Sequence, residues 1–311
     1  MAFDWVQLWD ETSKPDNVPI LIMSAAVGYY LWYGFREAVR HDRLITQLEA
    51  DPALAKTHHR KPYPFHPAWD KVVHTWPYLL RVEFLAALIV TVGLIVWAIW
   101  LPAPLEPPAN PTLTTNPAKA PWYFLGLQEL LVYFDPWIAG VILPHLVLGG
   151  LMAIPYIDVN PLGNGYYTWR QRKFAISTYM FGFLVLWVLL AVVGTFIRGP
   201  GWMWFWPGMT WDAHRQVHEV NQHLHELFGL TDPWAVGIFG GIVTLGGIGA
   251  AMGVADVLFR KFKPKTFLRQ NLVQYLITLH LIALMAAVPL KIVLKLVFNI
   301  KYIWVTPWFN V

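Results

Sequence analysis

A carboxylate set among aromatic side chains is the first feature of this sequence that could carry out chemistry. On a helical period of 3.6 residues, one stripe of segment 121–134 holds Trp122, Gly126, Glu129 and Tyr133. Gly126 has no side chain, so a flat ring could lie over it within reach of the carboxylate. A carboxylate in an apolar pocket takes up a proton more readily than one in water. We therefore expect Glu129 to act as a proton acceptor, with a solvated carboxylate on an amphipathic helix as the alternative.

Further aromatic residues lie at the start of the same segment. Pro121 suits the first turn of a helix, where its missing N–H has no partner to lose. Trp122 and Tyr123 follow it directly, and Phe124 is their aromatic neighbour. These residues predict an amphipathic helix over 121–134 whose aromatic side chains form the walls of a binding pocket.

The elements that must position these residues are membrane helices. Apolar residues make up 56% of the 311 residues and charged residues only 14%, well below the roughly 25% of a soluble domain. Crossing a hydrocarbon core takes about 20 residues of helix. Runs of suitable length occur near 18–35, 79–101, 137–157, 174–196, 234–258 and 271–290. We therefore expect an all-α integral membrane protein of about six transmembrane helices, with the amphipathic helix in a periplasmic loop.

Charge indicates how the chain is oriented and which partners are excluded. The formal net charge is +4, but the basic residues lie at helix ends rather than in a patch, which argues for a lipid surface and against nucleic acid. Most of the 23 lysines and arginines fall in alternate loops on one side. By the positive-inside rule that side faces the cytoplasm. Both termini and the loops 102–136 and 197–233 are then periplasmic.

The lack of cysteine and the spacing of the histidines limit which cofactor and metal sites the chain can form. The sequence has no cysteine, which excludes disulfides, thiolate ligation of iron–sulfur clusters and a Cys-x-x-Cys-His haem attachment within it. The first 17 residues are acidic and lack the basic start of a signal peptide, so we expect a prokaryotic inner-membrane protein. His214 and His218 have a spacing that could bind metal, but we interpret them as a solvated surface and expect no metal site.

A series of landmarks across residues 61–202 resembles the C-terminal half of cytochrome b, or subunit IV in complexes where that protein is split. The landmarks are PAPLEPPANP, WYF, a span that opens with ILP and closes with IPYID, the turn NPLGNG, the basic RQRK and finally IRGPGW. The resemblance implies three regions: an N-terminal helix and cytoplasmic linker in 1–78, a three-helix core in 79–202, and a periplasmic loop with two additional transmembrane helices in 203–311.

The resemblance also implies cofactors and partners. In that family, paired histidines in the first half of cytochrome b bind two b haems, and the second half supplies part of a quinol-oxidation pocket. The expected spans here hold only His145 and His280, whereas two such haems need four ligands. We therefore expect no cofactor on this chain alone, a shared quinol pocket and haem b in a partner. The partners implied are a haem-bearing cytochrome b N-terminal-type subunit, a Rieske-type or other iron–sulfur protein and a c-type cytochrome.

One departure from the family affects the site. The family pocket motif reads Pro-Glu-Trp-Tyr, and alignment on Trp122 and Tyr123 places Ala120 and Pro121 where Pro and Glu would stand. Glu129 is eight residues farther on, about 12 Å along a helix, so it is no isosteric replacement. Two functions remain open. One is a subunit of a cytochrome bc-type quinol oxidoreductase that contributes to the periplasmic-side pocket, and the other is a structural membrane anchor with a degenerate quinone pocket.

Overall fold

The fold is a bundle of long helices with small elements gathered at one end. The structure is a computed structural model that describes residues 5–15, 17–58, 75–101, 108, 110–112, 114–162, 166–206, 209–212, 214, 220–262 and 269–311. Within these residues, six helices are long and apolar enough to cross a membrane: Val18–Ala50, Thr75–Trp100, Ile138–Ile157, Trp169–Ile197, Pro233–Phe262 and Leu272–Phe298. The protein is thus an all-α, multi-pass membrane protein, and the prediction of about six spans is confirmed.

Several of these spans are composite. The second joins η1 (Thr75–Leu79) to α4 (Leu80–Trp100), and the third joins η3 (Ile138–Ile142) to α6 (Leu143–Ile157). The fourth runs from α7 (Trp169–Met180) through η4 (Phe181–Val188) and α8 (Leu189–Val192) to η5 (Val193–Ile197). The first, fifth and sixth are α2 (Val18–Ala50), α9 (Pro233–Phe262) and α10 (Leu272–Phe298).

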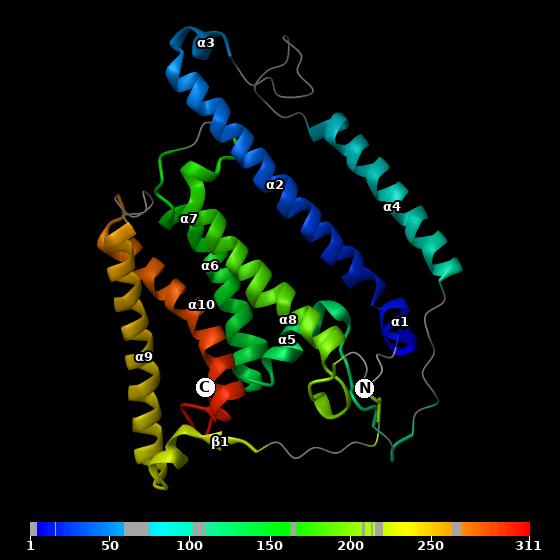
Figure 1. The fold of residues 1–311 in the computed structure, drawn as a ribbon, viewed down its shortest axis with the longest axis vertical. Helices are drawn as coiled ribbons and strands as arrows, with labels where there is room; N and C mark the ends of the chain where they lie inside the picture. Colours follow the sequence, from blue (N-terminus) through cyan, green and yellow to red (C-terminus); the bar gives the residue numbers. More distant parts are fainter. Residues whose placement is uncertain are drawn as a thin grey trace.

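The spans are unequally packed. In Figure 1, α6, α8 and α10 lie in the middle of the bundle, α9 flanks α10, and α2 crosses the other side. Helix α4 lies beyond α2, apart from the rest (Figure 1). Within the part of the chain that the structure describes, no residue of α4 is buried. The packed bundle therefore consists of the other five spans.

Helix α2 is longer than a membrane crossing requires. Its 33 residues extend about 50 Å, against a hydrocarbon core of about 30 Å. The span predicted near 18–35 therefore continues as helix to Ala50. Helix α3 (Pro52–Thr57) follows, and Asp51 caps it by accepting hydrogen bonds from the Ala53 and Leu54 amides.

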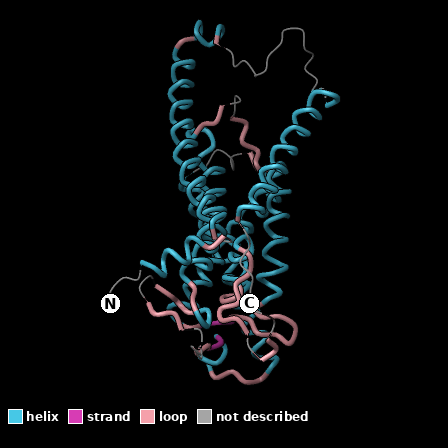
Figure 2. Tube along the Cα trace, turned by 90° about the vertical axis from the view of Figure 1, so that its right-hand side faces the viewer, coloured by secondary structure: helices cyan, strands magenta, loops and turns pink. Residues whose placement is uncertain are grey.

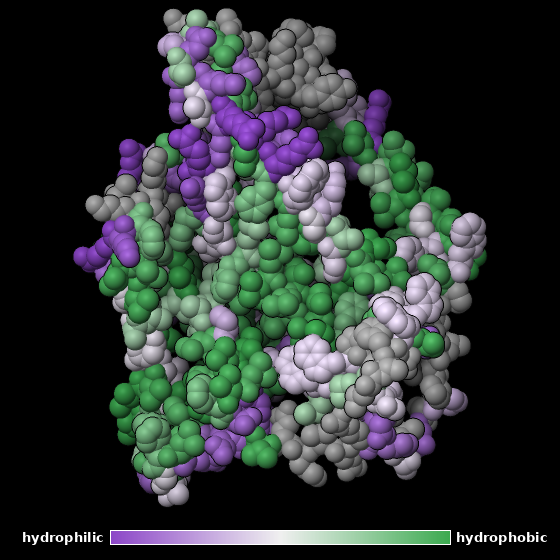
Figure 3. Space-filling model, in the orientation of Figure 1, coloured by the Kyte–Doolittle hydropathy of each residue, from purple (hydrophilic) through white to green (hydrophobic). Residues whose placement is uncertain are grey.

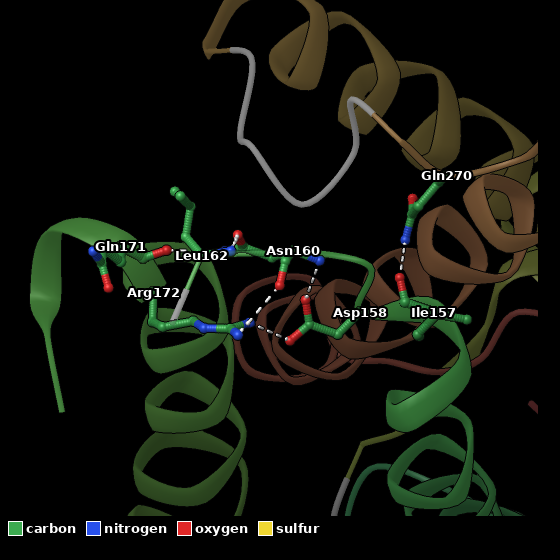
Figure 4. Close-up of polar contacts among 7 residues, drawn as sticks. All are labelled: Ile157, Asp158, Asn160, Leu162, Gln171, Arg172 and Gln270. Atoms are coloured by element: carbon green, nitrogen blue, oxygen red, sulfur yellow. Dashed lines mark hydrogen bonds and ion pairs between the residues drawn. The ribbon is translucent and has the colours of Figure 1, made fainter. Parts of the chain in front are cut away.

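Polar contacts among the described residues near the end of α6 and the start of α7 hold these two helices together. Arg172 Nη1 lies 3.0 Å from Asp158 Oδ2, and Asn160 Nδ2 donates to the Gln171 carbonyl at 2.9 Å. Gln270, from the segment before α10, donates to the Ile157 carbonyl at the end of α6 (Figure 4). Arg172, Asn160 and Gln270 thus connect the end of α6 to the starts of α7 and α10.

Most of the small elements lie at the end of the molecule opposite α3, where Figure 1 labels α1, α5 and β1 and Figure 2 shows the strands among loops. They include α1 (Trp5–Ser13), η2 (Trp122–Phe124), α5 (Leu125–Leu130), η6 (Pro200–Trp202) and η7 (Leu224–Phe228), together with two short parallel strands, β1 (Gln222–His223) and β2 (Ile300–Tyr302). In Figure 1 the two chain ends lie at this same end. The membrane side on which the termini and the loops 102–136 and 197–233 lie stays a prediction.

The apolar surface and the buried core occupy different places. Figure 3 shows hydrophobic residues across the middle of the molecule, with hydrophilic residues above and below them. The main buried cluster lies where α5 meets the third, fourth and sixth spans. Its members are Leu130, Tyr133, Phe134, Ile138, Ala139, Leu190 and Val288. The core therefore includes part of segment 121–134, in which the sequence placed the candidate site.

Candidate functional site

The segment predicted as one helix is broken into shorter pieces. A single 3₁₀ turn, η2, is followed by the six-residue α5, and residues 131–134 form a turn. Pro136 contributes to this break, because a proline disfavours helical backbone at the residue before it. The prediction of a continuous helix over 121–134 is therefore wrong, although its start after Pro121 is correct.

Glu129 lies in the interior of the protein and accepts four hydrogen bonds. Its side chain is 0% exposed. Oε1 accepts from Arg198 Nη2 at 2.6 Å and from the Tyr133 hydroxyl at 2.7 Å. Oε2 accepts from Arg198 Nε at 2.9 Å and from the Trp202 indole N–H at 3.1 Å. An ionised carboxylate has about four acceptor positions, so its hydrogen-bonding capacity is filled.

Arg198 is the functional candidate that the sequence reading missed. It directly follows the fourth span, and its side chain is 3% exposed. Besides the two hydrogen bonds to Glu129, its Nη1 donates to the Trp202 carbonyl at 2.9 Å, and its guanidinium lies 4.2 Å from the centre of the Trp204 ring. The sequence offered one signal for this role: Arg198 is a single basic residue between an apolar span and the GPGW sequence. An ionisable residue at the end of a membrane span usually has a partner.

A tight turn after the span directs Arg198 and Trp202 onto the carboxylate. A Cβ atom on Gly199 would lie 2.6 Å from Phe205 Cβ, so only glycine fits there. Gly201 has a φ of +67°, which glycine adopts without strain. The backbone returns because the Gly199 N–H donates to the Met203 carbonyl at 2.9 Å. The glycines of the IRGPGW landmark thus shape the turn, and its arginine and tryptophan bind Glu129.

The electrostatics of this network favour a charged pair and a neutral phenol. Burial raises the pKa of Tyr133 far above its ordinary value, and the charge of Glu129 and the hydrogen bond to it raise that pKa further. Burial by itself would lower the pKa of Arg198, but the hydrogen bonds and charge of Glu129 outweigh it, so the pKa is raised. Tyr133 therefore remains a hydroxyl donor and Arg198 a cation.

The space over Gly126 is filled by the protein itself. A Cβ atom at this position would lie 3.3 Å from Trp187 Cδ1 and 3.6 Å from the Ala191 amide nitrogen. The expectation that a flat ring could lie over Gly126 is wrong, because the fourth span packs there. The missing side chain instead allows α5 to approach that span closely.

The three aromatic residues of η2 form a separate, outward-facing group. Tyr123 is 48% exposed and Phe124 is 51% exposed, while Trp122 is half-buried. The rings of Trp122 and Tyr123 meet edge to face at 5.7 Å, and those of Tyr123 and Phe124 lie 4.7 Å apart. Among the hydrogen bonds of the described residues, none joins these side chains to Glu129. The structure therefore brings Glu129 and Tyr133 together and leaves the aromatic group on the surface.

The histidines singled out in the sequence are placed only in part. Among the residues described, no group of three or more His, Cys, Asp or Glu could hold a metal ion. His218 lies outside the described residues, so its spacing from His214 has no structural counterpart. His145 contacts the Val141 carbonyl through Nδ1 at 2.7 Å, within its own helix, and His280 is exposed.

Comparison with known proteins finds similar curated chains, two of which follow. A protein of Geobacillus thermodenitrificans is 35% identical over 115 residues, which are 35% of this chain and 45% of the relative. A protein of Bacillus subtilis (strain 168) is 33% identical over 114 residues, 34% of this chain and 43% of the relative. Both are named menaquinol:cytochrome c reductase cytochrome c subunit. The matched region thus spans less than half of these relatives. No protein-family profile and no solved structure matches the chain.

These names correct the expectation about cofactors. We expected no cofactor on this chain alone, but its relatives are named as cytochrome c subunits, and a c-type cytochrome carries covalently attached haem. The expectation is therefore withdrawn. The 311 residues contain no cysteine, so they do not themselves offer a Cys-x-x-Cys-His attachment site for haem c.

Proposed function

We propose that this chain is a membrane subunit of a cytochrome bc-type quinol oxidoreductase and contributes part of a quinol-oxidation pocket on the periplasmic side. The observation that carries the proposal is the buried carboxylate of Glu129 on α5, the helix that directly follows the exposed aromatic turn η2. The relatives support it, because both are named as subunits of menaquinol:cytochrome c reductase. The cytochrome b-like series of landmarks supports the same assignment, with menaquinol as the substrate class.

The exposed aromatic group of η2 suits the wall of a pocket shared with another subunit. Flat rings pack against aromatic side chains in offset or edge-to-face arrangements, and Trp122, Tyr123 and Phe124 offer such surfaces. Gly126 allows α5 to pack against the fourth span, and the Tyr133 hydroxyl donates a hydrogen bond to the Glu129 carboxylate. In this proposal the quinol lies against the η2 aromatics and not over Gly126.

Quinol oxidation releases two protons and two electrons. We assign one proton to Glu129: one O–H bond of the quinol breaks, and the carboxylate becomes a carboxylic acid. The other O–H bond breaks as well, and its proton leaves to water on the periplasmic side. The electrons leave for the iron–sulfur protein and the haem-bearing subunit proposed as partners. Because all four acceptor positions of Glu129 are occupied, proton uptake requires one hydrogen bond to open. That from the Trp202 indole, at 3.1 Å, is the longest.

The proposed partners account for the unpacked parts of the bundle. Helix α4 carries no charged residue after Glu83, has no buried residue and lies apart from the other spans (Figure 1). A haem-bearing cytochrome b-type subunit would pack against it in the prokaryotic inner membrane, with both termini of this chain periplasmic. A c-type cytochrome and an iron–sulfur protein would complete the assembly.

A second function is favoured by one specific observation. The carboxylate of Glu129 is paired with Arg198, and the glutamate of the family motif is replaced by Pro121. A subunit that only anchors its partners would need the buried pair for stability and would need no proton acceptor.

Changing Glu129 to Gln in the assembled complex separates the two functions. General-base assistance is typically worth about 10² to 10⁴ in rate. Quinol-oxidation turnover should therefore fall at least about tenfold in Glu129→Gln while the haem content of the complex stays unchanged. Glu49→Gln, at the exposed end of α2, serves as the matched control. Normal turnover in Glu129→Gln would exclude it as the base, and normal turnover in Trp122→Ala as well would favour the anchor.

A further inference from the structure

Arg198 has a second set of partners that does not depend on Glu129. Its Nη1 donates to the Trp202 carbonyl at 2.9 Å, and its guanidinium lies 4.2 Å from the Trp204 ring centre. A cation over an indole face is attracted by the ring electrons. The charge of Arg198 would therefore still be compensated if the Glu129 carboxylate became neutral.

Glu129 is held more tightly through one of its oxygens than through the other. Oε1 has the two shortest hydrogen bonds, 2.6 Å to Arg198 and 2.7 Å to Tyr133. Oε2 has the longer pair, 2.9 Å to Arg198 and 3.1 Å to Trp202. An incoming proton has least to displace at Oε2, and Tyr133 and Arg198 can hold Oε1 in place meanwhile.

We infer that Arg198 is a positioning residue for proton uptake: its two hydrogen bonds hold the Glu129 carboxylate in place between turnovers, and its charge opposes the arrival of the quinol proton. This inference rests on the proposed function. A guanidinium beside a carboxylate favours its charged form, so Arg198 competes with the proton. When the quinol O–H bond breaks, the proton goes to Oε2 and Arg198 stays charged against Trp202 and Trp204. The two electrons go to the iron–sulfur and haem-bearing partners.

The test compares pH profiles of turnover in the purified complex for Arg198→Met and Arg198→Lys. Without its cation the buried carboxylate takes up protons more readily, so it is available as a base only at higher pH. The acidic limb of the profile should move up by about one to three pH units in Arg198→Met. It should move less in Arg198→Lys, which retains a positive charge. Arg172→Met, which breaks the ion pair at the other end of the bundle, is the matched control and should leave the profile unchanged.

The double variant Glu129→Gln/Arg198→Met removes both charges and guards against misassembly of the single variant. Its turnover should equal that of Glu129→Gln, and the acidic limb should be absent from both. A low turnover in Glu129→Gln together with wild-type profiles in Arg198→Lys and Arg198→Met would overturn the role of Arg198 and leave the proposed function standing. If Arg198→Met does not assemble, the neutral Arg198→Gln takes its place, and an unshifted profile in that variant has the same meaning. Normal turnover in Glu129→Gln would instead refute the proposed base.

Discussion

Two arginine–carboxylate pairs at opposite ends of the bundle have similar geometry and different surroundings. Arg172 and Asp158 lie 3.0 Å apart with 34% and 24% of their side chains exposed. Arg198 and Glu129 lie 2.6 Å apart with 3% and 0% exposed. Water screens the first pair, and the second has only protein around it. The comparison teaches that burial, and not the pairing itself, makes an ion pair costly to break and a candidate for chemistry.

The largest difference between the pairs should appear when each arginine is removed. Arg198→Met leaves a buried carboxylate without its cation, which typically costs about 3–5 kcal/mol. Arg172→Met should cost at most about 1 kcal/mol, because partly exposed pairs contribute little. Denaturant unfolding of the two variants in detergent measures both values. Equal losses would show that the burial difference has no energetic meaning.

A second prediction concerns the turn that presents Arg198. Gly199→Ala forces a Cβ atom to within 2.6 Å of Phe205 Cβ, so the turn must shift, at a cost of about 1–3 kcal/mol. Gly246→Ala is the matched control, since a Cβ atom there meets open space. Thermal unfolding of both variants checks the prediction. A loss in Gly246→Ala as large as that in Gly199→Ala would argue against the packing explanation.

The smallest expected effect is the pH dependence of stability that comes from His223, which lies at the same end of the molecule as the buried pair. Burial lowers the pKa of His223, and the like charges of His225, Lys301 and Lys291 lower it further, against an opposing contribution from Glu226. The unfolded chain then binds a proton at a higher pH than the folded chain. Stability from this group is present above about pH 6.5 and is lost as the pH falls below that value.

Thermal unfolding between pH 7.5 and pH 5.5 measures this loss, and His223→Gln should reduce it. The same change at exposed His214 is the control. An identical pH dependence in wild type and His223→Gln would refute the assignment to His223. If confirmed, the result would add a second, weaker electrostatic element to the end of the bundle that holds Glu129 and Arg198.

The membrane helices were predictable because each depends on its own composition. A long apolar run must be covered by lipid or protein wherever it lies, so the six spans follow from local hydropathy. The contact between Glu129 and Tyr133 was also predictable, since the two residues are four apart. The extension of α2 to Ala50 was not predicted, because charged residues after 35 resemble those of a solvated linker as much as those of a helix that leaves the membrane.

By itself, the sequence determined the number of spans, the place of Glu129 beside aromatic residues and the absence of cysteine within these 311 residues. Only the tertiary structure decided that Glu129 is paired, because Arg198 is 69 residues away along the chain. It also decided that Trp187 fills the space over Gly126. Periodicity reports which residues share a face of one helix, but the partner across that face depends on how the helices pack.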